Sequence, residues 1–245
     1  QKTADDSSAR KALEEDVEDI RGIASEEDLD DVKGKALEED LENIKNKAIE
    51  FGSHGKMKVD AKVIPVSQIV VDERSKYKCY YPMCRWYGSN VMCPPMTPMA
   101  DDVRDLVGRY KYAVLIRVLG KPEHFTTEGW QRRLNHKYFM KLNNLVQMVE
   151  AYAQRKGHYL AIGFGAGHCR LCGLEINPKV KCVAVGKGGI DYTKCPYPLR
   201  VRPAMEAMGI DAFETVSNAG WASNFIGKSS GSDWLISQGS NEDVE

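Results

Sequence analysis

The chain has 245 residues, of which 42% are hydrophobic and 28% are charged, and its formal net charge is −1. This length and composition are typical of a globular protein that can bury a sizeable core without cysteine staples. They exclude a membrane-spanning helix, because no apolar run approaches the roughly 18 residues that such a helix needs.

The small net charge hides an asymmetry along the chain. Residues 1–50 carry 8 Lys and Arg against 17 Asp and Glu, a balance of −9, and the remaining residues carry 26 against 18, a balance of +8. An acidic N-terminal arm is therefore joined to a basic body. The sequence begins without the apolar core of a signal peptide, so we expect a cytoplasmic protein.

The arm, residues 1–52, is predicted to form two helices. Lys11–Ile20 recurs as Lys35–Ile44, and in both copies the apolar residues share one face at helical spacing. So narrow an apolar stripe is typical of a solvated extension or of a helical hairpin that docks on the body or on a protein partner. The regularity of both faces favours docking. Phe51–Gly55 is predicted to be the linker that follows.

The body, residues 56–227, is predicted to be an α/β domain with a small, mostly parallel sheet. Alternating and β-branched residues predict strands at Lys58–Pro65, Tyr112–Leu119, Tyr159–Gly163 and Phe213–Val216. Periodicity and end signals predict helices over 101–107, 127–156 and 202–209. A long helix between two strands is the signature of a crossover that joins parallel strands.

Residues 228–245 are rich in Ser and Gly and also acidic, so they are predicted to be a flexible tail. Trp234 lies within this tail and is a candidate contact for the body surface or for a protein partner.

All seven cysteines of the chain fall into two groups. The upstream group is Cys79-x4-Cys84-x8-Cys93, and the downstream group is Cys169-x2-Cys172-x9-Cys182-x12-Cys195. Cytoplasmic thiols stay reduced, so cysteines in close-spaced groups indicate metal ligands rather than disulfides.

The downstream group offers four thiolates, a complete tetrahedral set for a metal centre. Its irregular spacing and the proline after Cys195 favour an iron–sulfur cluster such as [4Fe-4S] over zinc, because the second knuckle of a zinc ribbon is missing.

The upstream group offers only three thiolates, which leaves two alternatives. Either a fourth ligand comes from a histidine, a partner chain or the second group, or one iron stays open to bind substrate as a Lewis acid. A closed centre predicts an electron carrier or a structural clamp, and an open one predicts an enzyme.

Glycines precede the downstream group at 163, 165 and 167. No helix and no Gly-Lys-Ser/Thr follows them, so they do not indicate a phosphate loop. We expect Gly165 and Gly167 to let backbone N–H groups approach a bound cluster, and His168 is a candidate ligand or proton donor. Other catalytic patterns are absent, and no aromatic-basic interleaving indicates a nucleic-acid partner.

Several motifs resemble one known family in their order: Cys84–Pro95, Gly167–Cys172, Cys195–Pro198 and Arg202–Asp211. The chain resembles the predicted metal-binding proteins of anaerobic bacteria and archaea called domain of unknown function 2284, over roughly Cys79 to Val216. The resemblance implies an iron–sulfur protein of anaerobic metabolism without implying a reaction. The family usually places a third cysteine where this chain has Glu175, so Cys182 is expected to replace it.

Together these observations predict one or two [4Fe-4S] clusters in an electron-transfer component of a larger anaerobic enzyme assembly. The acidic arm and the C-terminal tail are the predicted contacts with a protein partner. An enzyme with an open iron at the upstream group and a zinc-stabilised scaffold are the alternatives.

Overall fold

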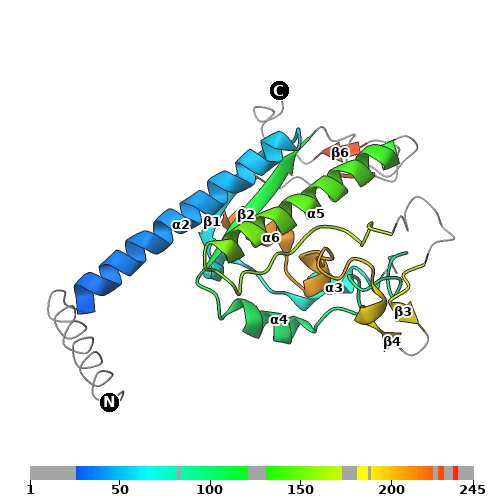
Figure 1. Ribbon diagram of the computed structural model, residues 1–245. Helices are drawn as coiled ribbons and strands as arrows, with labels where there is room; N and C mark the ends of the chain where they lie inside the picture. The colour runs from blue at the N-terminus through cyan, green and yellow to red at the C-terminus, as the bar shows by residue number, and fades with distance from the viewer. Residues whose placement is uncertain are drawn as a thin grey trace, which may run out of the picture. The chain divides into compact units, whose positions relative to one another are not determined.

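The computed structural model describes residues 26–81, 84–120, 131–172, 181–186, 189–222, 226–228 and 234–236 (Figure 1). The chain divides into two compact units, Gln1–Asn43 and Ile44–Glu245. The described part of the first unit is the N-terminal portion of helix α2 (Glu26–His54). The second unit contains the rest of α2 and all other described elements.

The centre of the second unit is a sheet of two antiparallel strands, β1 (Lys58–Pro65) and β2 (Tyr112–Leu119). Ala61 lies opposite Ile116, and strand alternation places both on the same face. This face packs on the C-terminal part of α2 and on α5 (Gln131–Arg155). The buried residues of this core are Ile44, Ala48, Met57, Ala61, Leu145, Val149 and Ala153.

The opposite face of the sheet carries charged residues under a tryptophan. Arg117 of β2 pairs with Asp60 of β1 at 3.0 Å, and its guanidinium lies 4.6 Å from the ring centroid of Trp221. Lys62 lies 5.1 Å from the same ring and donates to the carbonyl of Ala219. Trp221 follows α6 (Ala212–Asn218) and is buried, so it covers the apolar stems of both cations.

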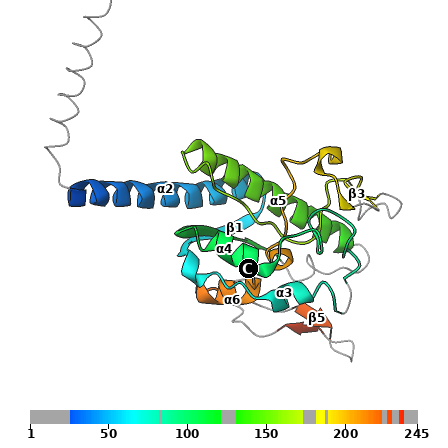
Figure 2. The same cartoon turned by 90° about the horizontal axis from the view of Figure 1, so that it is seen from below.

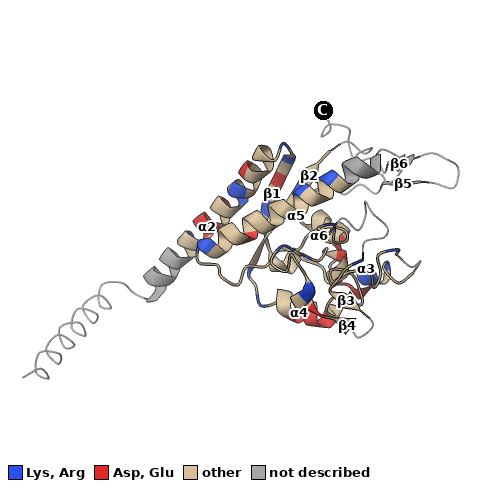
Figure 3. Ribbon diagram, turned by 45° about the vertical axis from the view of Figure 1, so that its right-hand side comes forward, with Lys and Arg blue, Asp and Glu red and all other residues tan. Residues whose placement is uncertain are grey.

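A second apolar cluster joins α4 (Ala100–Val107) to two segments far apart in sequence. Val103 of α4 packs with Ile210, which follows the 3-10 helix η4 (Glu206–Met208), and with residues around η1 (Val66–Gln68). The N–H of Asp72 donates to the Gly209 carbonyl at 2.7 Å. Asp101 and Asp102 lie in the first turn of α4, where their negative charges interact favourably with the positive end of the helix dipole (Figure 3).

The predicted, mostly parallel sheet is wrong. The described residues form three two-stranded sheets, and each is antiparallel: β1–β2, β3 (Val185–Gly186) with β4 (Gly189–Ile190), and β5 (Ile226–Lys228) with β6 (Trp234–Ile236). Parallel pairing occurs among them only at the isolated bridge between Gly165 and Ala204. The long helix α5 therefore does not connect parallel strands.

Two predicted strands are absent for identifiable reasons. Tyr159 and Leu160 lie in a turn, closed by the Ala161 N–H donating to the His158 carbonyl at 2.8 Å, and the chain then returns along α5 (Figures 1 and 2). Tyr159 is 76% exposed instead of buried. Phe213–Val216 lies within α6, because the Asp211 side chain caps the helix by accepting the Glu214 N–H at 3.0 Å. Local capping outweighs β-branched composition there.

Two predicted strands and two predicted helices are confirmed, and two other predictions are corrected. The strands at 58–65 and 112–119 are β1 and β2, the helix at 101–107 is α4, and α5 covers the described part of 127–156. Phe51–His54, predicted to be a linker, belongs instead to α2, and of the helix predicted at 202–209 only η4 forms. The first helix predicted in the arm lies outside the described residues. Among those described, no helix is long and apolar enough to cross a membrane.

The close approach of α2 to β1 requires a glycine. A Cβ added at Gly52 would lie 2.2 Å from Cγ2 of Val59, whereas one added at Gly34 of the same helix would meet nothing within 4 Å.

We therefore expect opposite effects from one substitution at these two positions. Gly34→Ala should raise the free energy of unfolding by up to about 1 kcal/mol, because alanine has the better helix propensity. Gly52→Ala should lower it by about 1–3 kcal/mol through overpacking. Chemical denaturation followed by circular dichroism measures both, and a neutral Gly52→Ala would contradict this packing.

Candidate metal centre

Two side chains of α5 hold the segment that leads into the downstream cysteines. Glu150 Oε2 accepts the Gly163 N–H at 2.6 Å. Asn143 accepts the Ala166 N–H at 3.0 Å and donates to the Ala166 carbonyl at 3.2 Å. These bonds satisfy backbone groups that a neighbouring strand would otherwise pair. A Cβ at Gly165 would lie 2.0 Å from Asn143 Oδ1, so only glycine permits this contact.

The same Glu150 holds the chain beyond the last cysteine. Arg202 binds it in a bidentate manner, with Nε 2.7 Å from Oε2 and Nη2 2.5 Å from Oε1, and both side chains are largely buried. Helix α5 therefore anchors the downstream cysteine region on both sides.

Three downstream cysteines, Cys169, Cys182 and Cys195, lie in one buried cluster. The β3–β4 hairpin folds the chain back between the last two, and the Asp191 N–H donates to the Ala184 carbonyl at 2.8 Å. Cys172 is partly exposed. Burial raises the pKa of Cys169 to about 11. A hydrogen bond with the Leu171 backbone opposes this rise, and the thiols of Cys172, Cys182 and Cys195 add to it. All four thiols thus lie close enough to interact.

The upstream cysteines lie on a succession of turns. The Cys84 N–H donates to the Cys79 carbonyl at 3.0 Å, and the Cys93 N–H donates to the Asn90 carbonyl at 3.3 Å. Cys93 is buried, whereas Cys79 and Cys84 are partly exposed. Burial raises the pKa of Cys93 to about 12, and the thiols of Cys79, Cys84 and Cys169 add to the rise.

Side chains of the two loops make direct contact. Trp86 of the upstream loop stacks on His168, with ring centroids 3.8 Å apart and planes 13° apart. Met92 packs in the same cluster as Cys169. The two cysteine groups therefore form one continuous region.

Asn90 supports the upstream thiols. Its side chain is wholly buried, and Nδ2 donates to Cys93 Sγ at 3.3 Å while Oδ1 accepts the Met92 N–H at 3.1 Å. An N–H donor favours the thiolate, so this bond lowers the pKa of Cys93 against the larger effect of burial. Sequence reasoning missed Asn90, although its place three residues before a cysteine was a usable signal.

Lys76 of α3 (Glu73–Tyr77) is also buried beside the upstream group. Burial lowers its pKa, while Glu73, Cys79 and Asp102 favour its charged form. Burial, Cys84 and Glu206 raise the pKa of Cys79, and Lys76 opposes them. Lys76 and Cys79 thus favour each other's charged form, against the effect of burial on both.

The predicted cofactor-binding residues precede Cys169. Gly165 packs on α5 as described. Gly167 has φ +67°, and a Cβ there would lie 2.7 Å from Arg170 Nη1, so both its conformation and its surroundings favour glycine. His168 is buried under Trp86. Their contact with a cluster stays a prediction.

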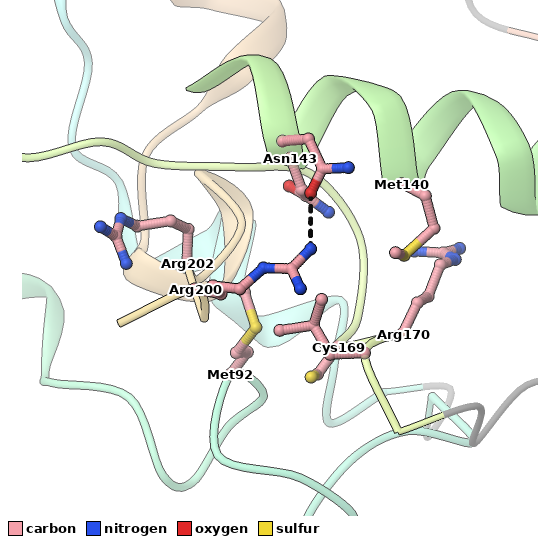
Figure 4. Close-up of a pocket in the computed structure, with 9 residues that line it drawn as sticks. Met92, Met140, Asn143, Cys169, Arg170, Arg200 and Arg202 are labelled. Atoms are coloured by element: carbon pink, nitrogen blue, oxygen red, sulfur yellow. Dashed lines mark hydrogen bonds between the residues drawn. The ribbon is translucent and has the colours of Figure 1, made fainter. Parts of the chain in front are cut away.

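A small pocket opens beside Cys169, where α5 meets both cysteine loops (Figure 4). Arg200 Nη2 donates to Asn144 Oδ1 at 3.2 Å at this pocket. The lining residues are Met92, Met140, Asn143, Asn144, Cys169, Arg170, Leu171, Arg200 and Arg202. Cys169 is the one cysteine among the lining residues.

A family model described as "Predicted metal-binding protein (DUF2284)" matches residues 62–236, which include all seven cysteines. The chain belongs to the DUF2284 family. The resemblance inferred from the cysteine motifs is thereby confirmed, and the matched region begins after the acidic arm. A search of curated proteins and a search of solved structures each found no match.

Within the described ranges, no three His, Cys, Asp or Glu side chains are arranged to hold a single metal ion. All seven cysteines are free thiols.

Substitution of Asn90 tests its role in this DUF2284 site. Asn90→Ala should weaken metal binding about 10- to 100-fold, because the Cys93 sulfur loses its donor. It should also destabilise the metal-free protein by about 1–3 kcal/mol, because the Met92 N–H loses its acceptor. Metal titration and chemical denaturation measure these effects.

Asn218→Ala is the matched control, since this exposed side chain donates only to the Gln68 carbonyl at 3.2 Å among the interactions described. Unchanged metal binding by Asn90→Ala would show that the Asn90–Cys93 bond does not support the site.

Proposed function

We propose that this DUF2284 protein is a cytoplasmic iron–sulfur electron carrier with one cluster on each cysteine group. Cys169, Cys172, Cys182 and Cys195 are the proposed ligands of the downstream cluster, and Cys79, Cys84 and Cys93 those of the upstream cluster. The observation that carries the proposal is that the two cysteine loops pack against each other, with Trp86 stacked on His168 and Met92 in one cluster with Cys169.

The spacing of the cysteines favours clusters over zinc. A zinc ribbon contributes two Cys-x2-Cys knuckles, and this chain has one such pair, Cys169 and Cys172. In an iron–sulfur cluster each thiolate binds a different iron, so the sulfurs surround a larger object. The burial of Cys169, Cys182 and Cys195 in one cluster supports such a centre.

Metal binding at the buried thiols has to displace protons. Cys93 and Cys169 stay protonated at neutral pH without a cation, because burial raises their pKa values to about 12 and about 11. Thiolates are the form that binds metal, so binding displaces these protons and compensates the buried charge. A bound cluster would supply one-electron redox chemistry at this site.

The difference in burial between the groups supports electron transfer. Cys79 and Cys84 are partly exposed beside Tyr81, which is 85% exposed, whereas three downstream cysteines are buried. An electron can therefore enter at the upstream group and pass through the contact between the loops. We further propose that the acidic arm and the C-terminal tail dock this carrier in a larger anaerobic enzyme assembly.

Metal analysis of anaerobically purified protein tests the proposal. We expect a brown protein with about eight iron and eight sulfide per chain, as two [4Fe-4S] clusters require. Cys93→Ser should remove one EPR signal, and Cys172→Ser should remove the other. Zinc without sulfide would overturn the proposal, and loss of both signals in Cys93→Ser would indicate one shared centre.

The partial exposure of Cys79 and Cys84 also favours a second function, an enzyme that admits substrate at an open position of the upstream centre. Adding small anionic ligands such as cyanide to the reduced protein distinguishes the two functions. A changed upstream EPR signal supports the enzyme, and an unchanged signal supports the carrier.

A further inference from the structure

The largest wholly buried side chain in the described structure belongs to a lysine. Lys76 is 2% exposed, and its Nζ donates to the carbonyls of Thr97 at 3.2 Å and Pro98 at 2.5 Å. Lysine is almost never fully buried unless it is paired. Among the described residues, however, no carboxylate forms an ion pair with it.

The position of Lys76 relates it to the upstream cysteines. Its own carbonyl accepts the Cys79 N–H at 2.9 Å, and its Nζ reaches across to the residues that follow Cys93. It therefore joins the two ends of the upstream loop.

The charge balance of the loop indicates what the ammonium compensates. Residues 74–100 contain four Lys and Arg and no Asp or Glu, so only thiolates can supply negative charge within this segment. Glu73 and Asp102 flank the segment and act on Lys76 from a distance. Carbonyl oxygens alone compensate a buried ammonium poorly, and neutral thiols add almost nothing.

We propose that Lys76 is the built-in counter-ion of the upstream metal centre, a positioning residue whose buried ammonium compensates the negative charge that thiolates bring to this loop, with Cys79 as its neighbour in the chain. This inference rests on the proposed function only in requiring metal at the upstream group. Three thiolates bound to a cluster make the centre anionic, so the cation stabilises the loaded state. It also stabilises an added electron, which raises the reduction potential of the centre.

A comparison of loaded and metal-free protein tests the counter-ion role. Lys76→Met keeps the apolar length of the side chain and removes the charge. Full-length protein is denatured chemically, after anaerobic reconstitution with iron and sulfide and after chelation under reducing conditions. We expect Lys76→Met to lose stability mainly in the loaded state and to bind metal at least tenfold more weakly at the upstream group.

Lys78→Met is the matched control, because this exposed lysine follows the same helix α3 and lies over Phe213. It should leave both states unchanged. Equal destabilisation of loaded and metal-free Lys76→Met would overturn the proposal, since it would reduce Lys76 to a structural cap of the two carbonyls.

Redox titration provides a second readout. At a fixed potential, Lys76→Met should lower the ratio of reduced to oxidised upstream centre about tenfold, which is 59 mV for a one-electron couple. Lys76→Arg should retain most of the wild-type potential, and the downstream centre serves as the internal reference. An unchanged upstream potential in Lys76→Met would contradict the proposal.

Failure of the proposed function gives a different result. If wild-type protein takes up zinc and no sulfide, the electron-carrier function is wrong. The stability comparison then runs with zinc and still decides whether Lys76 balances a metal–thiolate centre.

Discussion

The hydrogen bonds from Asn143 and Glu150 of α5 position the candidate metal centre. These two side chains lie two turns apart on the helix and bind the backbone between Gly163 and Ala166 as a neighbouring strand would. Glu150 also binds Arg202. Because α5 packs on the central sheet, the segments on either side of the downstream cysteines are fixed to the rigid part of the protein.

The cysteine region is stabilised by polar groups as well as by apolar packing. A cluster of buried thiols is apolar while its members are protonated, but it becomes a concentration of charge once metal binds. Asn90 stabilises the charged state by donating an N–H···S bond to Cys93. Lys76 is proposed to stabilise it through its buried ammonium. Both residues serve the upstream group, where Cys79 and Cys84 are partly open to water.

Much of the local structure could be predicted from the sequence. Strands β1 and β2 and helices α4 and α5 follow apolar periodicity, which a regular element imposes on its own residues. The two cysteine groups could be recognised by their spacing, and the family match agrees with the motifs that surround them. In each case the deciding pattern lies within a short stretch of chain.

Only the tertiary structure decided how the sheet pairs, where the glycine segment runs and which polar residues are buried. Tyr159–Gly163 has the composition of a strand, but side chains bind its backbone instead of a neighbouring strand. Glu150 and Gln154 of α5 bind Gly163 and Ala161, and the Tyr110 hydroxyl donates to the Leu160 carbonyl, which no local pattern reveals. Lys76 and Asn90 are ordinary polar residues in the sequence. Their significance comes from long-range packing, because burial and proximity to thiols depend on segments that meet only in the folded chain.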